Sequence, residues 1–324
     1  MIQLQEKQKE RSGKVAQKVL MIVGPTAVGK TTLSIKLAQK FNGQVVSGDS
    51  MQIYQKLDIG TAKVTNEEMQ GIPHYLLDEI PIDQRFSVAD FIDRTRKAIL
   101  KIAAQDALPM LVGGTGFYLQ SLVDDFHFGN DQYQDDHLRN QLHQYAAENG
   151  QQALWDRLDQ IDPVAAAKIP VTNERRVIRA LEVFEKTGKK FSVQSDHPNN
   201  NYDFLIIGLN TARSVLYERI NHRVDLMVKE GVLDEARYLY ENGGSKLPAG
   251  KGIGYKEFYP YFEHQASLEE CIAKVKQNSR HYAKRQLTWF RNKMDVHWFD
   301  LVQNFDTDYP QIIELVEKWL KEKK

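Results

Sequence analysis

Eight residues near the N-terminus have the spacing of a loop that binds phosphate groups. The segment Gly24-Pro25-Thr26-Ala27-Val28-Gly29-Lys30-Thr31 follows an apolar run at 19–23 and opens a helical pattern. In this G-x-x-x-x-G-K-[ST] spacing, backbone N–H groups turn inward on a phosphate chain, the lysine reaches the outer oxygens and the last hydroxyl can hold Mg²⁺. The motif predicts a phosphate site, but it leaves open whether the phosphate is an energy source or a leaving group.

Polar side chains follow two further apolar runs. The run at 44–47 ends in Ser47-Gly48-Asp49-Ser50, and the run at 109–113 is followed by Gly114-Thr115-Gly116. The carboxyl ends of parallel strands face the same crevice as a phosphate loop, so Asp49 is placed to accept a proton or to orient Mg²⁺ through water. The alternative for Asp49 is a turn or a helix cap. Many nucleotide hydrolases carry an Asp at the second of these positions, and its absence here disfavours that class.

Basic residues recur at helical spacing. Arg175 and Arg179 share one predicted helix face, and Arg219 and Arg223 share another. Their planar guanidinium groups suit phosphate oxygens, although a solvated, salt-bridged face is the alternative. Between residues 271 and 294 there are seven Lys and Arg and no Asp or Glu, interleaved with aromatic side chains. In a chain of formal net charge zero, this segment indicates a local polyanion site, or alternatively an amphipathic helix with its aromatics in the core.

The elements that must position these residues alternate along the first 120 residues. Apolar runs predict strands at 19–23, 44–47, 75–80 and 109–113, with a further strand at 204–209. Helical patterns cover 30–41 and a segment to about 105 that begins with the capping box Ser87 and Asp90. This alternation predicts an α/β fold with a P-loop NTPase-like parallel sheet core.

The strand signal disappears between 122 and 201, so we expect an all-helical insertion domain there. Residues 18–121 and 202–324 are expected to form the P-loop core with a helical C-terminal region, after a polar tail at 1–17. The single Cys271 excludes an internal disulfide, and no apolar run is long enough to span a membrane. No signal-peptide pattern is present at the N-terminus. We expect a cytoplasmic monomer.

Taken together, the motifs resemble the tRNA dimethylallyltransferases, also called tRNA isopentenyltransferases, in the bacterial form that has no C-terminal zinc finger. The ordered set of blocks carries the resemblance, since no single block is decisive. In the order typical of that family, the matching blocks are 24–31, 47–54, 58–63, 73–78, 112–116, Arg176 with 179–183, 253–255 and 283–289.

The resemblance implies a reaction. A dimethylallyl group would pass from dimethylallyl diphosphate to the exocyclic N6 amine of the adenosine 3′-adjacent to the anticodon (position 37) of tRNAs that read codons beginning with U. The products would be N6-isopentenyladenosine and diphosphate. The partners would be dimethylallyl diphosphate and the tRNA anticodon stem-loop, with Mg²⁺ as cofactor.

The resemblance also implies residue roles. Gly24 to Thr31 would hold the diphosphate, with Thr26 near its bridging or α-phosphate oxygens and Thr31 facing Mg²⁺. Asp49 resembles the general base, Arg223 the arginine that grips the diphosphate, and Thr115 and His74 residues that line the site. We predict the following tRNA-binding residues: Asp49, Ser50, Met51, Gln52, Thr115, Arg139, Arg175, Arg176, Val177, Ile178, Arg179, Gly250, Lys251, Gly252, Ile253, Gly254, Tyr255, Lys284 and Arg285.

Three alternatives stay open from the residues themselves. The main one is an ATP-dependent kinase of a small metabolite, because the same loop serves ATP. The Gly-Thr end of the run at 109–113 and the basic segment at 271–294 count against it. A second alternative is prenyl transfer to free adenine nucleotides, which would give the helical insertion no role. The third, a non-catalytic RNA-binding module, would leave the phosphate loop and Asp49 unused.

Overall fold

The computed structural model describes residues 16–125, 137–193 and 201–322, which belong to two compact units. Unit 1 comprises residues 1–121 and 200–324, and unit 2 comprises residues 122–199. No helix within the described ranges is long and apolar enough to cross a membrane.

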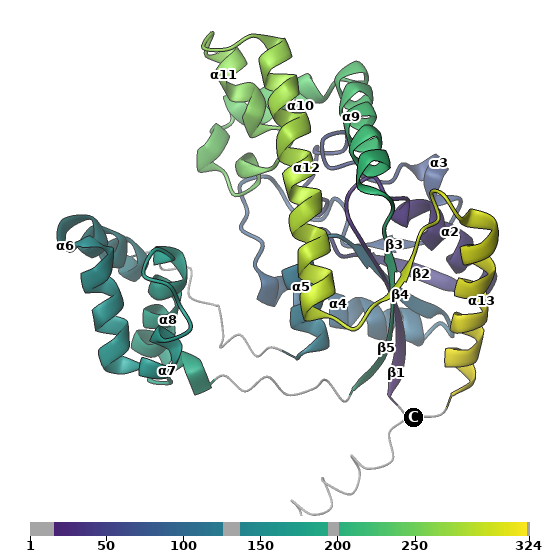
Figure 1. The fold of residues 1–324 in the computed structure, drawn as a ribbon, viewed down its shortest axis with the longest axis horizontal. Coiled ribbons are helices and arrows are strands. Elements are labelled where there is room, and N and C mark those ends of the chain that lie inside the picture. Colours follow the sequence, from purple (N-terminus) through teal and green to yellow (C-terminus); the bar gives the residue numbers. More distant parts are fainter. Residues whose placement is uncertain (1–15, 126–136, 194–200, 323–324) are drawn as a thin grey trace, which may run out of the picture. The chain divides into compact units, whose positions relative to one another are not determined.

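Unit 1 is built on one parallel sheet with the strand order β3-β2-β4-β1-β5-β6 (Figure 1). Its strands are β1 (Gln17–Val23), β2 (Gly43–Ser47), β3 (His74–Tyr75), β4 (Leu108–Gly113), β5 (Tyr202–Leu209) and β6 (His297–Phe299). Val19–Val23 of the central strand β1 are 0% exposed, as expected where a parallel sheet is covered on both faces. The predicted α/β fold with a parallel sheet core is confirmed.

The described part of unit 1 contains nine α-helices, only some of which pack on the sheet. They are α2 (Lys30–Phe41), α3 (Asn66–Met69), α4 (Val88–Ala103), α5 (Gly116–Val123), α9 (Arg213–Glu230), α10 (Val232–Glu241), α11 (Tyr259–Phe262), α12 (Leu268–Lys293) and α13 (Phe305–Lys321). Leu33 of α2, Ile220 of α9 and Val316 of α13 join the strands β1, β4 and β5 in one core cluster. Helix α4 contacts β2 and β4, and the predicted capping box of Ser87 and Asp90 opens it.

Short 3₁₀ turns connect the C-terminal helices: Gly244–Lys246, Ala249–Lys251 and Lys256–Phe258. One expected strand is shorter than predicted, and one strand was missed. The strand expected at 75–80 ends at Tyr75, because Leu76 and Asp78 have the left-handed backbone angles φ 61° and 54°, which break an extended chain. The strand β6 was not predicted, since three residues carry too short a pattern to recognise.

The described part of unit 2 consists of helices and one 3₁₀ turn, without a strand. These are α6 (His137–Ile161), α7 (Pro163–Ala166), α8 (Glu174–Thr187) and the turn at Phe191–Val193. Gly150 interrupts α6 with φ 87°, a conformation that suits glycine. Leu142 and Leu154 of α6 pack with Leu181 of α8 in a separate core, so unit 2 has its own apolar centre.

Candidate functional site

The phosphate-type loop lies between the end of β1 and the start of α2. Gly24 and Gly29 have φ values of 147° and 103°, which only glycine adopts easily. A Cβ on Gly24 would also stand 2.5 Å from the backbone oxygen of Leu209, so the loop passes close to the end of β5. Helix α2 then begins without a side-chain cap, and its positive dipole end faces the loop. This arrangement suits an anion.

Lys30 is folded back over the loop. Its Nζ donates to the backbone oxygen of Pro25 at 2.7 Å. Burial, helped by the nearby Arg223, lowers the pKa of Lys30 to about 7, and Asp49 offsets this in part. The lysine is therefore a cation whose charge is sensitive to what binds in the loop.

Asp49 follows β2 and lies close enough to Lys30 and Arg223 to feel their charges. One carboxylate oxygen, Oδ1, accepts from the backbone N–H of Met51 at 2.8 Å, so the turn predicted as an alternative for this residue is present. Burial raises the pKa of Asp49 above its usual range, opposed by the hydrogen bonds from Met51 and Gln52 and by the charges of Lys30 and Arg223. A carboxylate with a raised pKa beside two cations is suited to take up a proton.

The end of β4 touches the end of β2 because both carry glycines. A Cβ on Gly113 would stand 2.3 Å from the backbone of Gly48, so Gly113 has no room for a side chain. This close approach lets the N–H of Thr115 donate to the oxygen of Gly48 at 3.2 Å, while its hydroxyl accepts from the N–H of Ser50 at 3.0 Å. Thr115 is thereby fixed beside the turn that carries Asp49.

Helix α9 brings two arginines to the loop. Nη1 of Arg223 donates to the Thr26 hydroxyl at 3.3 Å, and Nε of Arg219 donates to the oxygen of Ala27 at 2.9 Å. Burial lowers the pKa of Arg223, and the charge of Asp49 raises it. The structure thus brings Thr26, Lys30 and Asp49 together with Thr115 and Arg223, which lie up to 197 positions from one another in the chain.

Two residues of α12 complete the site, and sequence reasoning did not assign either of them. The side chain of Gln286 accepts from the N–H of Thr26 at 3.0 Å and donates to the oxygen of Gly114 at 2.9 Å, which joins the phosphate loop to the end of β4. One turn earlier lies Tyr282, where burial raises the pKa of the hydroxyl and the side chains of Thr115 and Gln286 oppose this shift. The sequence signals were that both lie in or beside the block at 283–289 and that Tyr282 is one of the aromatic residues of the basic segment at 271–294.

Replacing Gln286 with leucine should lower the free energy of unfolding. The N–H of Thr26 and the oxygen of Gly114 would both lose their partner, at a cost of about 1–3 kcal/mol for each buried group left unpaired. Urea unfolding measures this loss. Gln277→Leu, at an exposed position of the same helix, is the control and should change the free energy little. Equal losses in the two variants would contradict the bridging role of Gln286.

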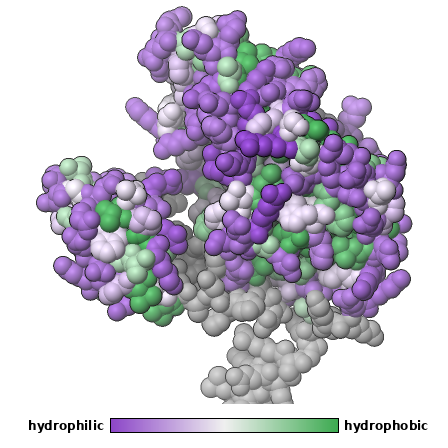
Figure 2. Space-filling view, viewed as in Figure 1, coloured by the Kyte–Doolittle hydropathy of each residue, from purple (hydrophilic) through white to green (hydrophobic). Residues whose placement is uncertain are grey.

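The remaining predicted residues lie in different environments. Thr31 is exposed in the first turn of α2, and the ring of His74 in β3 contacts the backbone oxygen of Ile72 at 2.8 Å. Lys284 and Arg285 are exposed on α12, whose visible side is largely hydrophilic in Figure 2. Of the segment 250–255, Lys251 is exposed and Ile253 is half-buried, whereas Gly250, Gly252, Gly254 and Tyr255 are buried.

Unit 2 carries the other predicted tRNA-binding residues. Arg175 and Arg176 are exposed at the start of α8, whereas the side chains of Val177 and Ile178 are 0% and 2% exposed in the core of the unit. Arg139 of α6 donates to the buried carboxylate of Glu182 at 2.9 Å, and Arg179 lies 3.9 Å from the same oxygen. Any contact of Val177 or Ile178 with a partner would therefore run through their backbone.

Comparison with known proteins gives consistent findings. A family model described as IPP transferase matches residues 52–293. A tRNA dimethylallyltransferase of Ligilactobacillus salivarius is 57% identical over 94% of this chain and 100% of its own length. The corresponding protein of Enterococcus faecalis is 52% identical over 95% and 99%.

Solved structures agree with these relatives. The full-length tRNA isopentenylpyrophosphate transferase of Bacillus halodurans is similar at a TM-score of 0.71 and 47% identity, covering 94% of this chain and 97% of that one. A eukaryotic dimethylallyltransferase acting on tRNA gives a TM-score of 0.80 at 31% identity and covers 94% and 79%.

Proposed function

The chain belongs to the IPP transferase family and is a prenyl-transferring enzyme, and on this premise we propose that it moves a dimethylallyl group from dimethylallyl diphosphate to the N6 amine of the adenosine 3′-adjacent to the anticodon of tRNA. The observation that carries the proposal is the convergence of a phosphate loop, two cations and one proton-accepting carboxylate in a single place. A diphosphate leaving group and an amine nucleophile need those groups.

The loop and its cations serve the leaving group. As the allylic carbon–oxygen bond breaks, negative charge accumulates on the diphosphate, and the N–H groups of residues 24–31 with Lys30 and Arg223 neutralise it. The hydrogen bond between Arg223 and the Thr26 hydroxyl supports a role for that hydroxyl beside the diphosphate oxygens. The positive charge that develops on the allylic fragment then draws the nucleophile.

A magnesium ion fits this loop only together with the substrate. Among the described residues, no group of three or more His, Cys, Asp and Glu side chains is arranged to hold a metal. Thr31 offers one exposed hydroxyl at the start of α2, and diphosphate oxygens would supply further ligands, which is the usual setting for Mg²⁺. When bound, the ion would neutralise charge on the departing diphosphate.

Asp49 serves the acceptor. An adenine amine is a weak nucleophile because its lone pair is delocalised into the ring, so a base that removes its proton during attack lowers the barrier. Thr115 and Ser50 fix the position of the turn that carries this carboxylate. The adenine must leave its stack to reach the site, and an anticodon loop presents unpaired bases that can do so.

Stem-loop substrates test the proposal directly. An anticodon stem-loop with adenosine at the target position should gain one prenyl group by mass spectrometry. The same stem-loop with inosine there, which lacks the exocyclic amine, should gain none. Equal modification of both would contradict N6 as the acceptor.

The binding of dimethylallyl diphosphate without tRNA should weaken as pH rises above about 7. The pKa of Lys30 is about 7 in the free protein, and a bound diphosphate raises it; above that pH, binding must therefore take up a proton. The affinity should then fall by up to about tenfold per pH unit relative to Lys30→Arg, whose guanidinium stays charged. Calorimetry in buffers of different ionisation enthalpy measures the proton uptake. Identical pH dependence in wild type and Lys30→Arg would rule out this role of Lys30.

Replacing Lys284 and Arg285 together with alanine should weaken tRNA binding and flatten its salt dependence by about one to two units of slope. Both residues are exposed in the part of α12 that carries Lys and Arg but no acidic residue. Binding titrations at several salt concentrations measure the slope. Lys318→Ala with Lys321→Ala on α13 removes the same charge elsewhere and should leave the slope unchanged. An unchanged slope in the α12 variant would show that Lys284 and Arg285 do not contact phosphates of the tRNA.

We also expect the enzyme to act as a monomer in the cytoplasm. A tRNA acceptor and the ordinary composition of the chain support this proposal.

A further inference from the structure

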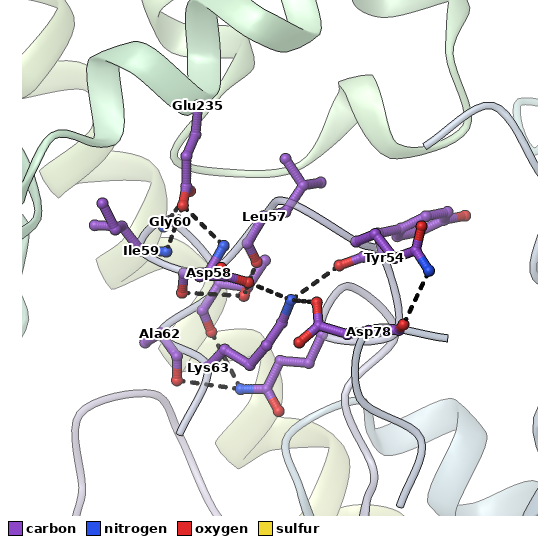
Figure 3. Close-up of polar contacts among 12 residues, drawn as sticks. Tyr54, Leu57, Asp58, Ile59, Gly60, Ala62, Lys63, Asp78 and Glu235 are labelled. Atoms are coloured by element: carbon purple, nitrogen blue, oxygen red, sulfur yellow. Dashed lines mark hydrogen bonds and ion pairs between the residues drawn. The ribbon is translucent and has the colours of Figure 1, made fainter. Parts of the chain in front are cut away.

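The loop at residues 54–63, between β2 and α3, is bound from outside by a carboxylate that has no role in the chemistry above. Glu235 of α10 accepts from the backbone N–H groups of Asp58 and Ile59, each at 2.8 Å, through Oε1. Its Oε2 accepts from the N–H of Gly60 at 3.0 Å (Figure 3). Three successive N–H groups form a concave nest that prefers an anion, and here the anion belongs to the protein itself.

The same carboxylate also holds the segment that leads into α11. The hydroxyl of Tyr255, whose side chain is 0% exposed, donates to Oε2 of Glu235 at 2.8 Å. The ring of Tyr255 packs against Gly60 so closely that a Cβ on Gly60 would stand 2.5 Å from it. Lys56 adds a cation–π contact with Tyr238 of α10, 5.0 Å from the ring centroid. The loop at 54–63 is therefore fastened to α10 at several points.

Lys63 holds the loop from inside. The residue is 9% exposed, and its Nζ donates to the backbone oxygen of Tyr54 at 2.9 Å, to Oδ1 of Asp58 at 2.6 Å and to the carboxylate of Asp78 (Figure 3). A nearly buried ammonium with three acceptors is a strong restraint, because movement of the loop would separate the charge from the partners that compensate its burial. The loop consequently has little freedom to move away from the sheet.

The loop at 54–63 also holds the turn that carries Asp49. The Gln52 side chain donates to the backbone oxygens of Thr61 and Ala62, both at 3.2 Å, and accepts from the hydroxyl of Ser47 at 2.9 Å. Ser47 and Gln52 flank Asp49 on either side, so a shift of the loop at 54–63 would be passed on to the carboxylate.

The helix that carries Glu235 is joined directly to the helix that carries Arg223. Helix α9 ends at Glu230, and Gly231, with φ 103°, leads straight into α10. Arg223 of α9 contacts the phosphate loop at Thr26, and Glu235 of α10 binds the loop that holds Asp49. One pair of consecutive helices therefore contacts both halves of the site.

We propose that Glu235 is a positioning residue, which sets the place of Asp49 relative to Arg223 and the phosphate loop through the loop at 54–63 and Gln52. This inference rests on the proposed function for its catalytic consequence. It makes Tyr255 a support of Glu235. It also gives the matching blocks at 58–63 and 253–255 a common purpose, because both bind the same carboxylate.

Glu235→Gln tests the proposal with a minimal change of shape. The carboxamide keeps one acceptor oxygen but replaces the other with an N–H₂ group, which in either orientation faces backbone N–H donors, those of Asp58 and Ile59 or that of Gly60. We expect kcat to fall by about 10- to 100-fold at saturating substrates, while the KM for dimethylallyl diphosphate stays within about twofold, because small misplacement of a reacting group is costly. Tyr255→Phe should have a smaller effect of the same kind. Glu241→Gln, at an exposed position of α10, is the control and should match wild type.

Two readouts separate positioning from general destabilisation. Burial raises the pKa of Asp49, while the hydrogen bond from Met51 and the charges of Lys30 and Arg223 lower it, so a displaced turn should shift the acid limb of the kcat profile along the pH axis. Amide hydrogen exchange should become at least about tenfold faster at Met51, whose N–H is bound to Asp49, and stay unchanged in α2.

The outcomes are distinct. Wild-type kcat, acid limb and Met51 exchange in Glu235→Gln would overturn the proposal. So would a lower kcat with an unmoved acid limb and exchange that is faster everywhere, because that pattern is loss of stability alone. If wild-type enzyme prenylates no tRNA, the proposed function fails; the exchange at Met51 still decides whether Glu235 positions the turn.

Discussion

Replacing Asp49 with alanine should lower kcat by about 10²–10⁴ while leaving tRNA affinity nearly intact. Asp49 stands beside Lys30 and Arg223 at the end of β2, and burial raises its pKa, so it is the group suited to take the proton of the adenine amine. Single-turnover rates with a labelled anticodon stem-loop measure the chemical step, and a binding titration measures the affinity. Equal turnover in mutant and wild type would remove Asp49 from the mechanism.

Asp49→Asn is the matched control for the turn. Asparagine can still accept from the N–H of Met51, as Asp49 does at 2.8 Å, but it cannot take up a proton. We expect it to be nearly as slow as the alanine variant. A turnover close to wild type would show that Asp49 holds the turn without acting as a base.

The pH dependence of the wild-type enzyme follows from the same residue. Since the base must be deprotonated, kcat should fall as pH decreases through the pKa of Asp49, which burial places above the usual range of an aspartate.

Replacing Arg223 with alanine should lower kcat/KM for dimethylallyl diphosphate by about 10²–10³, because one cation facing the leaving group is lost. Its Nη1 contacts the Thr26 hydroxyl in the phosphate loop at 3.3 Å, and partial burial strengthens its interaction with an anion. Arg223→Lys should recover only part of the loss, because lysine restores the positive charge but lacks the planar fork of arginine. Steady-state kinetics with varied dimethylallyl diphosphate provide the measurement.

Arg213 supplies the control for Arg223. It is exposed at the first position of the same helix, so Arg213→Ala removes the same charge from α9 outside the site. Its kcat/KM should stay near that of wild type. Similar losses in the two variants would mean that long-range charge, and not contact with the diphosphate, explains the role of Arg223.

The sequence predicted those features of the fold that depend on residues close together in the chain. The helix at 30–41 and the capping box of Ser87 depend on neighbouring residues, and both are present as predicted. The central strands carry long apolar runs because both faces of the sheet are covered. The strand predicted at 75–80 was too long, since nothing in its composition announced the left-handed residues Leu76 and Asp78.

Parts of the site that depend on tertiary contacts could not be found in this way. Spacing indicated the phosphate loop, and the position after a strand indicated Asp49. Gln286 and Glu235 carry no such pattern, because Gln286 contacts Thr26 and Gly114, and Glu235 contacts Gly60, at separations of 172 to 260 positions in the chain. The resemblance likewise assigned the whole stretch 175–179 to tRNA binding, although the side chain of Ile178 lies in the core.

The central claim is that the loop at 24–31 receives a departing diphosphate and does not bind ATP as a phosphate donor. The most direct measurement is product analysis after parallel incubations of enzyme and total tRNA with labelled dimethylallyl diphosphate and with γ-labelled ATP. We expect label in N6-isopentenyladenosine of the anticodon loop with release of diphosphate, and no transfer from ATP. Transfer of the γ-phosphate to any acceptor, with no prenylated adenosine, would contradict it.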